Sequence, residues 1–153
     1  TESELAQIRG RKIGFIFQQF NLIPTLTAME NVMLPMIFQG IGEETRKSHA
    51  KELLERVDLA ERLHHRPTEL SGGQQQRVAI ARSLSNNPEV IIADEPTGNL
   101  DSKTGTNVLD FLRELHKKDK KTIVMVTHDA HLAKVADRTE YLKDGKIVKS
   151  LND

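Results

Sequence analysis

The sequence predicts an α/β fold with a parallel sheet, and three apolar runs carry this prediction. Residues 90–94 and 122–126 are short runs rich in β-branched side chains, and helical apolar spacing fills 102–118 between them. Strands that alternate with helices in this way form parallel sheets. A third run, 13–17, ends in two glutamines, as expected of a buried strand that reaches the edge of a site.

Helical signals dominate the long segment between the first two of these runs. Thr27-Ala28-Met29-Glu30 matches a capping box, and Pro35 is expected to end or bend the helix that follows. Residues 43–57 place apolar side chains on one helical face and charges elsewhere. We therefore predict an α/β core and an inserted, mostly helical subdomain, at residues 1–26 with 87–153 and at 27–86.

Further local signals complete the predicted topology. Ser71 precedes a helical pattern that stops at Asn86-Asn87-Pro88. A short helix is expected from about residue 130, and Asp144-Gly145 predicts a hairpin between two short strands. The three apolar runs are expected to be neighbouring strands, with the run at 90–94 in the middle.

Composition excludes several classes of protein. Lys plus Arg and Asp plus Glu number 22 each, so no basic excess points to nucleic acid as a partner. Apolar stretches are only a few residues long, far from the ~20 needed to cross a bilayer. We expect no membrane span in this chain. Because it starts with Thr1-Glu2-Ser3, we also expect it to be a piece of a longer protein.

The glycines do not form a phosphate-binding loop. That loop requires Gly-x-x-x-x-Gly-Lys-Ser/Thr, and no two of the 9 glycines are spaced to fit it. We therefore expect no phosphate-binding loop within this sequence.

Two adjacent carboxylates, Asp94 and Glu95, follow the run at 90–94. Ligand sites in open α/β sheets lie where strands end, and two carboxylates there suit two tasks. One can hold Mg²⁺, and the other can orient or deprotonate the water that attacks a γ-phosphate. An apolar strand that ends in acidic residues without any function is the alternative.

Ser71, Gly72 and Gly73 are predicted to form an anion site at a helix start. Backbone amides and a hydroxyl would lie there at the positive end of the helix dipole, where a phosphate binds well. The alternative is a glycine turn that only caps the helix, but Gln74 and the acidic strand that come next favour a site. His128 lies just after the run at 122–126, and its imidazole could donate a hydrogen bond to a phosphate oxygen.

These motifs occur in the order found in the ATPase subunits of ABC transporters, which the chain resembles over nearly its whole length. Finer detail around residues 17–22 and 71–77 is similar to the lipoprotein-release and macrolide-export branch. The resemblance implies a partial P-loop NTPase (RecA-like) core. The Q-loop, signature, Walker B, D-loop and H-switch correspond to Gln18, 70–74, Asp94-Glu95, Asn99-Leu100-Asp101 and His128.

The resemblance also implies a reaction and partners. ATP and Mg²⁺ would bind between two subunits in a head-to-tail dimer, coupled to a transmembrane permease at the cytoplasmic face of the cell membrane. The missing loop would lie before Thr1, and its strand would leave a gap or an exposed edge beside the 122–126 strand. The implied roles are Mg²⁺ binding for Asp94 and Gln18, catalysis for Glu95, His128 and Gln18, and nucleotide contact for Ser71, Gly72, Gly73, Gln74 and Asp101.

Two alternatives remain open at this point. An SMC- or Rad50-like C-terminal ATPase lobe would also carry a signature motif, but it would follow a heptad coiled coil and would have no Gln18 loop. A non-catalytic module that docks a partner is the second alternative. Its groove would use apolar side chains of the helical segment, namely Phe20, Leu22, Ile23, Met33, Met36 and Phe38.

Overall fold

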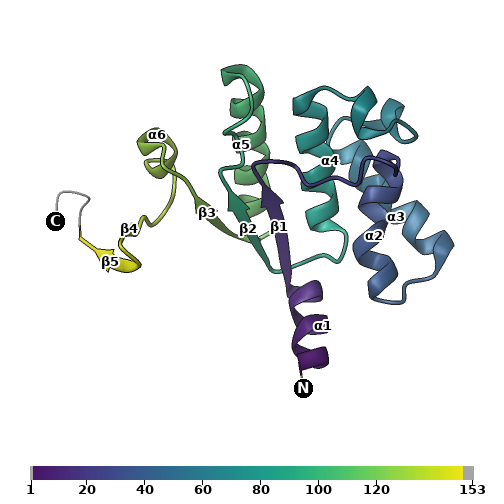
Figure 1. Ribbon diagram of the computed structural model, residues 1–153, viewed down its shortest axis with the longest axis horizontal. Coiled ribbons are helices and arrows are strands. Elements are labelled where there is room, and N and C mark those ends of the chain that lie inside the picture. The colour runs from purple at the N-terminus through teal and green to yellow at the C-terminus, as the bar shows by residue number, and fades with distance from the viewer. Residues whose placement is uncertain (1, 150–153) are drawn as a thin grey trace.

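The structure, a computed structural model, describes residues 2–149, and its centre is a three-stranded parallel sheet (Figure 1). The strands are β1 (Ile13–Phe17), β2 (Val90–Asp94) and β3 (Thr122–Val126), in the order β1-β2-β3. Two further strands, β4 (Tyr141–Lys143) and β5 (Lys146–Val148), form a separate antiparallel pair. The predicted α/β class and the central place of β2 are confirmed.

The helices lie mainly on one side of this sheet and beyond the β1 edge (Figure 1). The bounds of the helices are α1 Glu2–Lys12, α2 Ala28–Phe38, α3 Glu43–Arg56, η1 Ala60–Arg62, η2 Pro67–Glu69, α4 Gly72–Leu84, α5 Ser102–Lys117 and α6 Ala130–Ala133. In the chain, α2, α3 and α4 follow one another between β1 and β2, while α6, β4 and β5 extend away from the rest.

Two local predictions at α2 have different outcomes. The capping box is confirmed, because Glu30 N donates to Thr27 Oγ1 at 3.2 Å and Thr27 N donates to Glu30 Oε2 at 2.7 Å. Pro35, however, does not end the helix, which continues to Phe38. Met36, in that last turn, is only 1% exposed, and we attribute the continuation to its burial in the core.

One face of the sheet is packed against α4 and α5. Ile16, Ile91 and Ala93 are fully buried in the core on this side. Gly14 lies so close to α4 that a Cβ atom there would be 2.3 Å from the carbonyl oxygen of Ser83. A side chain at position 14 would therefore push β1 away from the helix.

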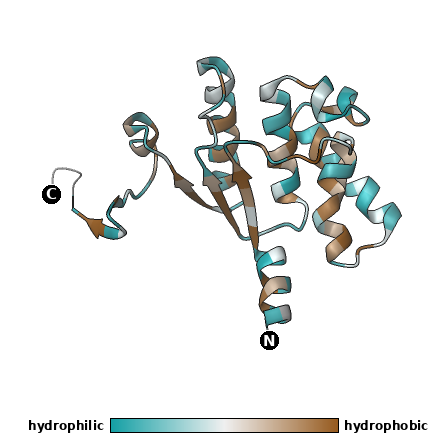
Figure 2. Ribbon diagram, viewed as in Figure 1, coloured by the Kyte–Doolittle hydropathy of each residue, from teal (hydrophilic) through white to brown (hydrophobic). Residues whose placement is uncertain are grey.

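The opposite face of the sheet is apolar and uncovered. Phe15, Phe17, Val124 and Val126 are between 36% and 52% exposed, and the two phenylalanine rings stack at 5.9 Å. The brown strands of Figure 2 show how apolar the sheet is. Parallel sheets normally have both faces covered. Within residues 2–149, β3 also pairs with no strand on its outer edge, which agrees with the expected exposed edge.

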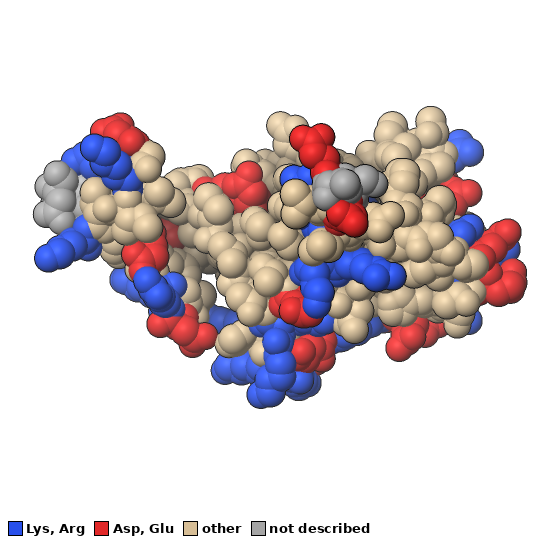
Figure 3. Space-filling model, turned by 90° about the horizontal axis from the view of Figure 1, so that it is seen from below, with Lys and Arg blue, Asp and Glu red and all other residues tan. Residues whose placement is uncertain are grey.

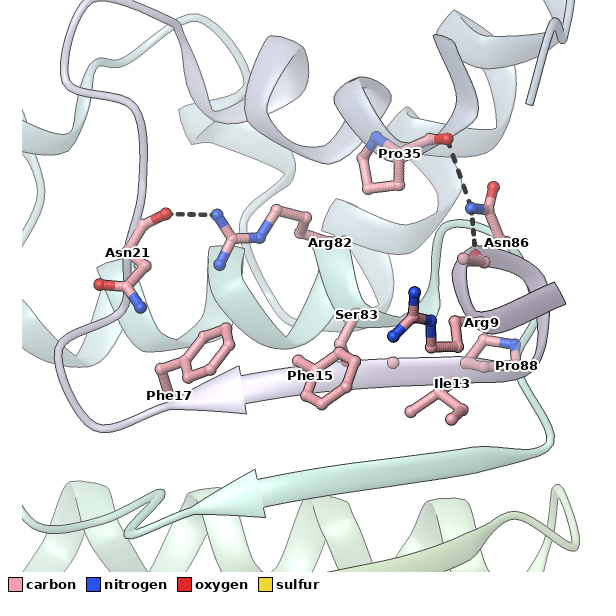
Figure 4. Close-up of a pocket in the computed structure, with 12 residues that line it drawn as sticks. Arg9, Ile13, Phe15, Phe17, Asn21, Pro35, Arg82, Ser83, Asn86 and Pro88 are labelled. Carbon is pink, nitrogen blue, oxygen red and sulfur yellow. Dashed lines mark hydrogen bonds between the residues drawn. The ribbon is translucent and has the colours of Figure 1, made fainter. Parts of the chain in front are cut away.

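At β1 this open face leads into a cavity of about 520 Å³ (Figure 4). The rings of Phe15 and Phe17 lie along one side of it, beside Arg9, and Pro35 points in from α2. Arg82 contributes a second guanidinium. Because it is continuous with the uncovered face, we treat the cavity as part of that face.

The uncovered face leads to a first prediction, that the chain self-associates through it. Val124→Lys should weaken the association, because a charge on an apolar contact face is costly to desolvate. Sedimentation velocity over a concentration series measures this. Val135→Lys is the matched control, since Val135 is 44% exposed against 47% for Val124 but lies outside the sheet. Equal association of the two variants would contradict the prediction.

Candidate active site

The carboxyl ends of the three parallel strands bring several predicted site residues together. In the sheet register, Phe17 pairs with Asp94 and Asp94 pairs with Val126. The residues that follow these strand ends therefore emerge along one edge of the sheet. They are Gln18 after β1, Glu95 after β2, and Thr127 and His128 after β3.

Glu95 is held by the segment that follows β3. Its carboxylate accepts hydrogen bonds from His128 N at 2.7 Å and Thr127 Oγ1 at 3.1 Å, and it contacts His128 Nδ1 at 2.5 Å. The Glu95 side chain is 17% exposed, whereas that of His128 is 87% exposed. The backbone of Glu95 is left-handed, with φ of +44°, which is uncommon for a residue with a side chain and is found often at functional sites.

These contacts set the charge of Glu95. Burial raises its pKa, but the hydrogen bonds from His128 and Thr127 and the charge of His128 together outweigh burial and lower it. Glu95 is therefore ionised near neutral pH and can accept a proton. With Nδ1 directed at Glu95, the His128 ring leaves Nε2 available, and a protonated ring could donate from it to a phosphate oxygen.

Asp94 fits the predicted metal role. It is exposed at the end of β2, and its carboxylate has no hydrogen bond or ion pair within the described residues. Residues 2–149 contain no group of three or more His, Asp or Glu placed to hold a metal ion by themselves. One carboxylate that takes Mg²⁺ together with phosphate oxygens and water is the usual arrangement for that ion.

Gln18 is held in place by Asn99, a residue of the segment that follows Glu95. Asn99 Nδ2 donates to the Gln18 carbonyl at 2.9 Å, and Gln18 Nε2 approaches Asn99 Oδ1 at 3.5 Å. Gly98 allows this contact, because a Cβ atom there would be 2.5 Å from Gln18 Nε2. Gly98 N also donates to the Glu95 carbonyl at 3.0 Å. The loop that follows β2 thus contacts Gln18 through Asn99 and holds Glu95 through Gly98.

The predicted anion site lies at the start of α4. Ser71 caps the helix, with Gln74 N donating to Ser71 Oγ at 3.3 Å and Ser71 N donating to Gln74 Oε1 at 2.9 Å. Ser71 and Gly72 are exposed, so the hydroxyl and the first amides of the helix face solvent. Phosphate binds such a helix start by its backbone amides and dipole.

The start of α4 lies against the start of α5. A Cβ atom on Gly73 would be 2.5 Å from Cγ2 of Thr104, so only glycine permits this approach. Asp101 caps α5 and accepts hydrogen bonds from Thr104 Oγ1 at 2.6 Å and Thr104 N at 3.0 Å, which lower the pKa of Asp101. Asp101 and Gly73 are therefore neighbours, joined by Thr104.

The predicted site residues thus fall into two groups. One surrounds Glu95 at the strand ends, and the other surrounds Ser71 at the start of α4, with residues 95–101 between them. Asn99 was predicted only as part of the D-loop motif and not as a partner of Gln18, and no contact role was predicted for Thr127 or Thr104, because each of the three contacts another site residue. Figure 3 shows acidic and basic side chains intermixed on the face seen from below, and neither sign dominates there.

The structure also tests the proposed docking groove. Met36 is buried, and Leu22 and Met33 pack against the core. Phe38, 76% exposed, and Ile23, 37% exposed, remain on the surface. Three of the six side chains assigned to the groove therefore pack in or against the core, two are exposed and Phe20 is half-buried, so docking of a partner there stays a prediction.

Comparison with known proteins identifies relatives of the chain. The family profile described as "ABC transporter" matches residues 2–98. An ABC transporter ATP-binding protein of Thermotoga maritima is 57% identical over 146 residues, which are 95% of this chain and 62% of that protein. The macrolide export ATP-binding/permease protein MacB of Aggregatibacter actinomycetemcomitans is 51% identical over 97% of this chain and 23% of its own length.

A solved structure agrees with this comparison. The ATP-binding cassette MJ0796 of Methanocaldococcus jannaschii, a dimer in a post-hydrolysis state bound to ADP and Pi, superposes with a TM-score of 0.84 at 52% identity. The match covers 96% of this chain and 65% of that chain. The chain thus spans just under two thirds of the length of these two cassette proteins. None of the helices within residues 2–149 has the length and apolarity to cross a membrane.

Proposed function

Because this chain belongs to the ABC transporter family of ATP-binding proteins, we propose that it supplies the signature and Walker B part of an ATP-hydrolysing subunit. The observation that carries the proposal is the contact of Glu95 with Thr127 and His128 at the strand ends. An ionised carboxylate that is held beside an exposed imidazole suits a base for water attack on a γ-phosphate.

Each predicted residue has a role in the proposed reaction. Asp94 binds Mg²⁺, Glu95 accepts a proton from the attacking water, and His128 donates to the γ-phosphate. Gln18, which is held by Asn99, would contact Mg²⁺ and the attacking water. Bound Mg²⁺ would neutralise charge that develops on the phosphate oxygens.

The start of α4 is proposed to serve a second subunit. Ser71 and Gly73 would contact the γ-phosphate of ATP bound by the partner, with Gly72 and Gln74 shaping the helix start. Asp101, which lies next to Gly73 through Thr104, would link the two nucleotide sites of the dimer. The dimer of the MJ0796 cassette supports this arrangement.

Membership of this family also supports the proposal of a partner in the membrane. MacB is an ATP-binding and permease protein in one chain, and we propose that the present chain likewise acts beside a permease at the cytoplasmic face of the membrane. An SMC- or Rad50-like role is disfavoured, since the match extends through the Gln18 strand and all three named relatives are transporter cassettes.

The test is gain of activity when the phosphate loop is added. The chain alone, without that loop, should show no ATP hydrolysis above background and a Kd for ATP in the millimolar range or weaker. The extended chain, in which a segment with the Gly-x-x-x-x-Gly-Lys-Ser/Thr loop and its strand precedes Thr1, should hydrolyse ATP. Calorimetry and phosphate release measure the two properties. Micromolar binding by the unextended chain, or an inactive extended chain that is folded, would contradict the proposal.

A further inference from the structure

A buried amide on α4 contacts the backbone next to Glu95. Gln76 is fully buried, and its Nε2 donates a hydrogen bond to the carbonyl oxygen of Pro96. Pro96 is itself among the fully buried side chains. The contact therefore ties the helix that begins after Ser71 to the residue that follows Glu95.

The rest of the turn around Glu95 is held by backbone hydrogen bonds. Glu95 N donates to the Val126 carbonyl at 2.9 Å, and Gly98 N donates to the Glu95 carbonyl at 3.0 Å. Pro96 has no N–H group, so its carbonyl is the one polar backbone group through which it can be held. The Gln76 amide holds that group.

Part of the Gln76 amide is expected to destabilise the fold. Its carbonyl oxygen, Oε1, is buried and has no hydrogen-bond partner within the described residues. A buried acceptor without a partner destabilises a fold, and an apolar side chain of similar shape is often at least as stable. A side chain kept only for stability would not be expected to leave this oxygen unpaired, which points to a role for the contact with Pro96.

We propose that Gln76 is a positioning residue that, through Pro96, holds Glu95 in its left-handed conformation against Thr127 and His128. Because Gln76 and Ser71 belong to one helix, the same contact joins the anion site at the start of α4 to the carboxylate at the strand ends. This deepens the proposed function and rests on it only in naming Glu95 as the base. The position of Glu95 itself can be measured without nucleotide.

The test is the rate of hydrogen exchange at the His128 amide in Gln76→Met, followed by NMR on the full chain at constant pH. His128 N donates to Glu95 Oε1 at 2.7 Å, so the position of Glu95 protects this amide. If the turn relaxes, the His128 amide should exchange about fivefold faster, the equivalent of one weakened hydrogen bond. The urea midpoint of unfolding should not fall.

Gln75→Met is the matched control. Gln75 is the adjacent amide on α4, but its Nε2 donates to the Leu70 carbonyl at 3.1 Å and not to Pro96. Its replacement should leave hydrogen exchange at the His128 amide unchanged. Gln76→Asn, whose amide is too short to reach Pro96, should reproduce the faster exchange seen with methionine.

Each outcome decides the proposal. Unchanged exchange at the His128 amide in either folded Gln76 variant would overturn it, and so would an equal acceleration in Gln75→Met. Loss of folding in both Gln76 variants would show that the amide serves the fold and not the position of Glu95. Since no ATP is used, failure of the ATPase proposal leaves this result unaffected, and the reverse also holds.

Discussion

Glu95→Gln in the extended chain is expected to lower kcat for ATP hydrolysis by about 10²- to 10⁴-fold, the contribution typical of general base catalysis. An amide keeps the shape of the carboxylate but cannot accept the proton of the attacking water. ATP binding should survive, so that ATP persists on the protein. Single-turnover phosphate release and filter retention of labelled ATP measure the two effects separately.

Glu89→Gln is the matched control for this variant. Glu89 directly precedes β2, at the end of the strand opposite to Glu95, where it pairs with Lys12 and is largely exposed. The same change from carboxylate to amide should leave kcat within about twofold of the unsubstituted protein, because surface pairs of this kind contribute little. Unchanged turnover in Glu95→Gln would instead assign the base to another group.

Local patterns predicted most of the elements. The strand runs, the capping box at Thr27, the helix start at Ser71 and the hairpin at Asp144-Gly145 are determined by neighbouring residues, and the structure contains all of them. At Asp144 and Gly145, φ values of +51° and +75° are those of the turn that Asp-Gly favours. α1 was missed, since its apolar residues do not form a buried face: Leu5 and Ile8 are both more than half exposed.

The contacts of the site could be predicted only in part. Motif order indicated that Glu95 and His128 lie at neighbouring strand ends, but their direct contact depends on the sheet register and on the left-handed backbone of Glu95. The approach of Gly73 to Thr104 depends on how two helices pack, which no local pattern encodes. The uncovered sheet face likewise appears only when the strands are assembled.

The second large effect is expected at Ser71, in association with an intact subunit. In the proposed dimer, this chain can offer its α4 start to ATP held by a complete partner, whereas two copies without a phosphate loop cannot form a site. MJ0796, solved as a dimer, is a suitable partner when it carries the change that corresponds to Glu95→Gln, because loss of the proposed base should let bound ATP persist. ATP-dependent association with this partner should appear in sedimentation velocity experiments.

Ser71→Arg should abolish that association, because the arginine side chain would fill the space that the phosphate needs above the first amides of α4. The change also removes the cap that Ser71 gives to Gln74 N, so Ser71→Asp is the second variant. Aspartate caps helices as well as serine does, yet its charge would repel the phosphate, so association should be lost while the free energy of unfolding stays within about 0.5 kcal/mol. Ser48→Arg, on the exposed surface of α3, should associate normally. Equal binding by Ser71→Asp and the unsubstituted chain would remove Ser71 from the partner's phosphate site.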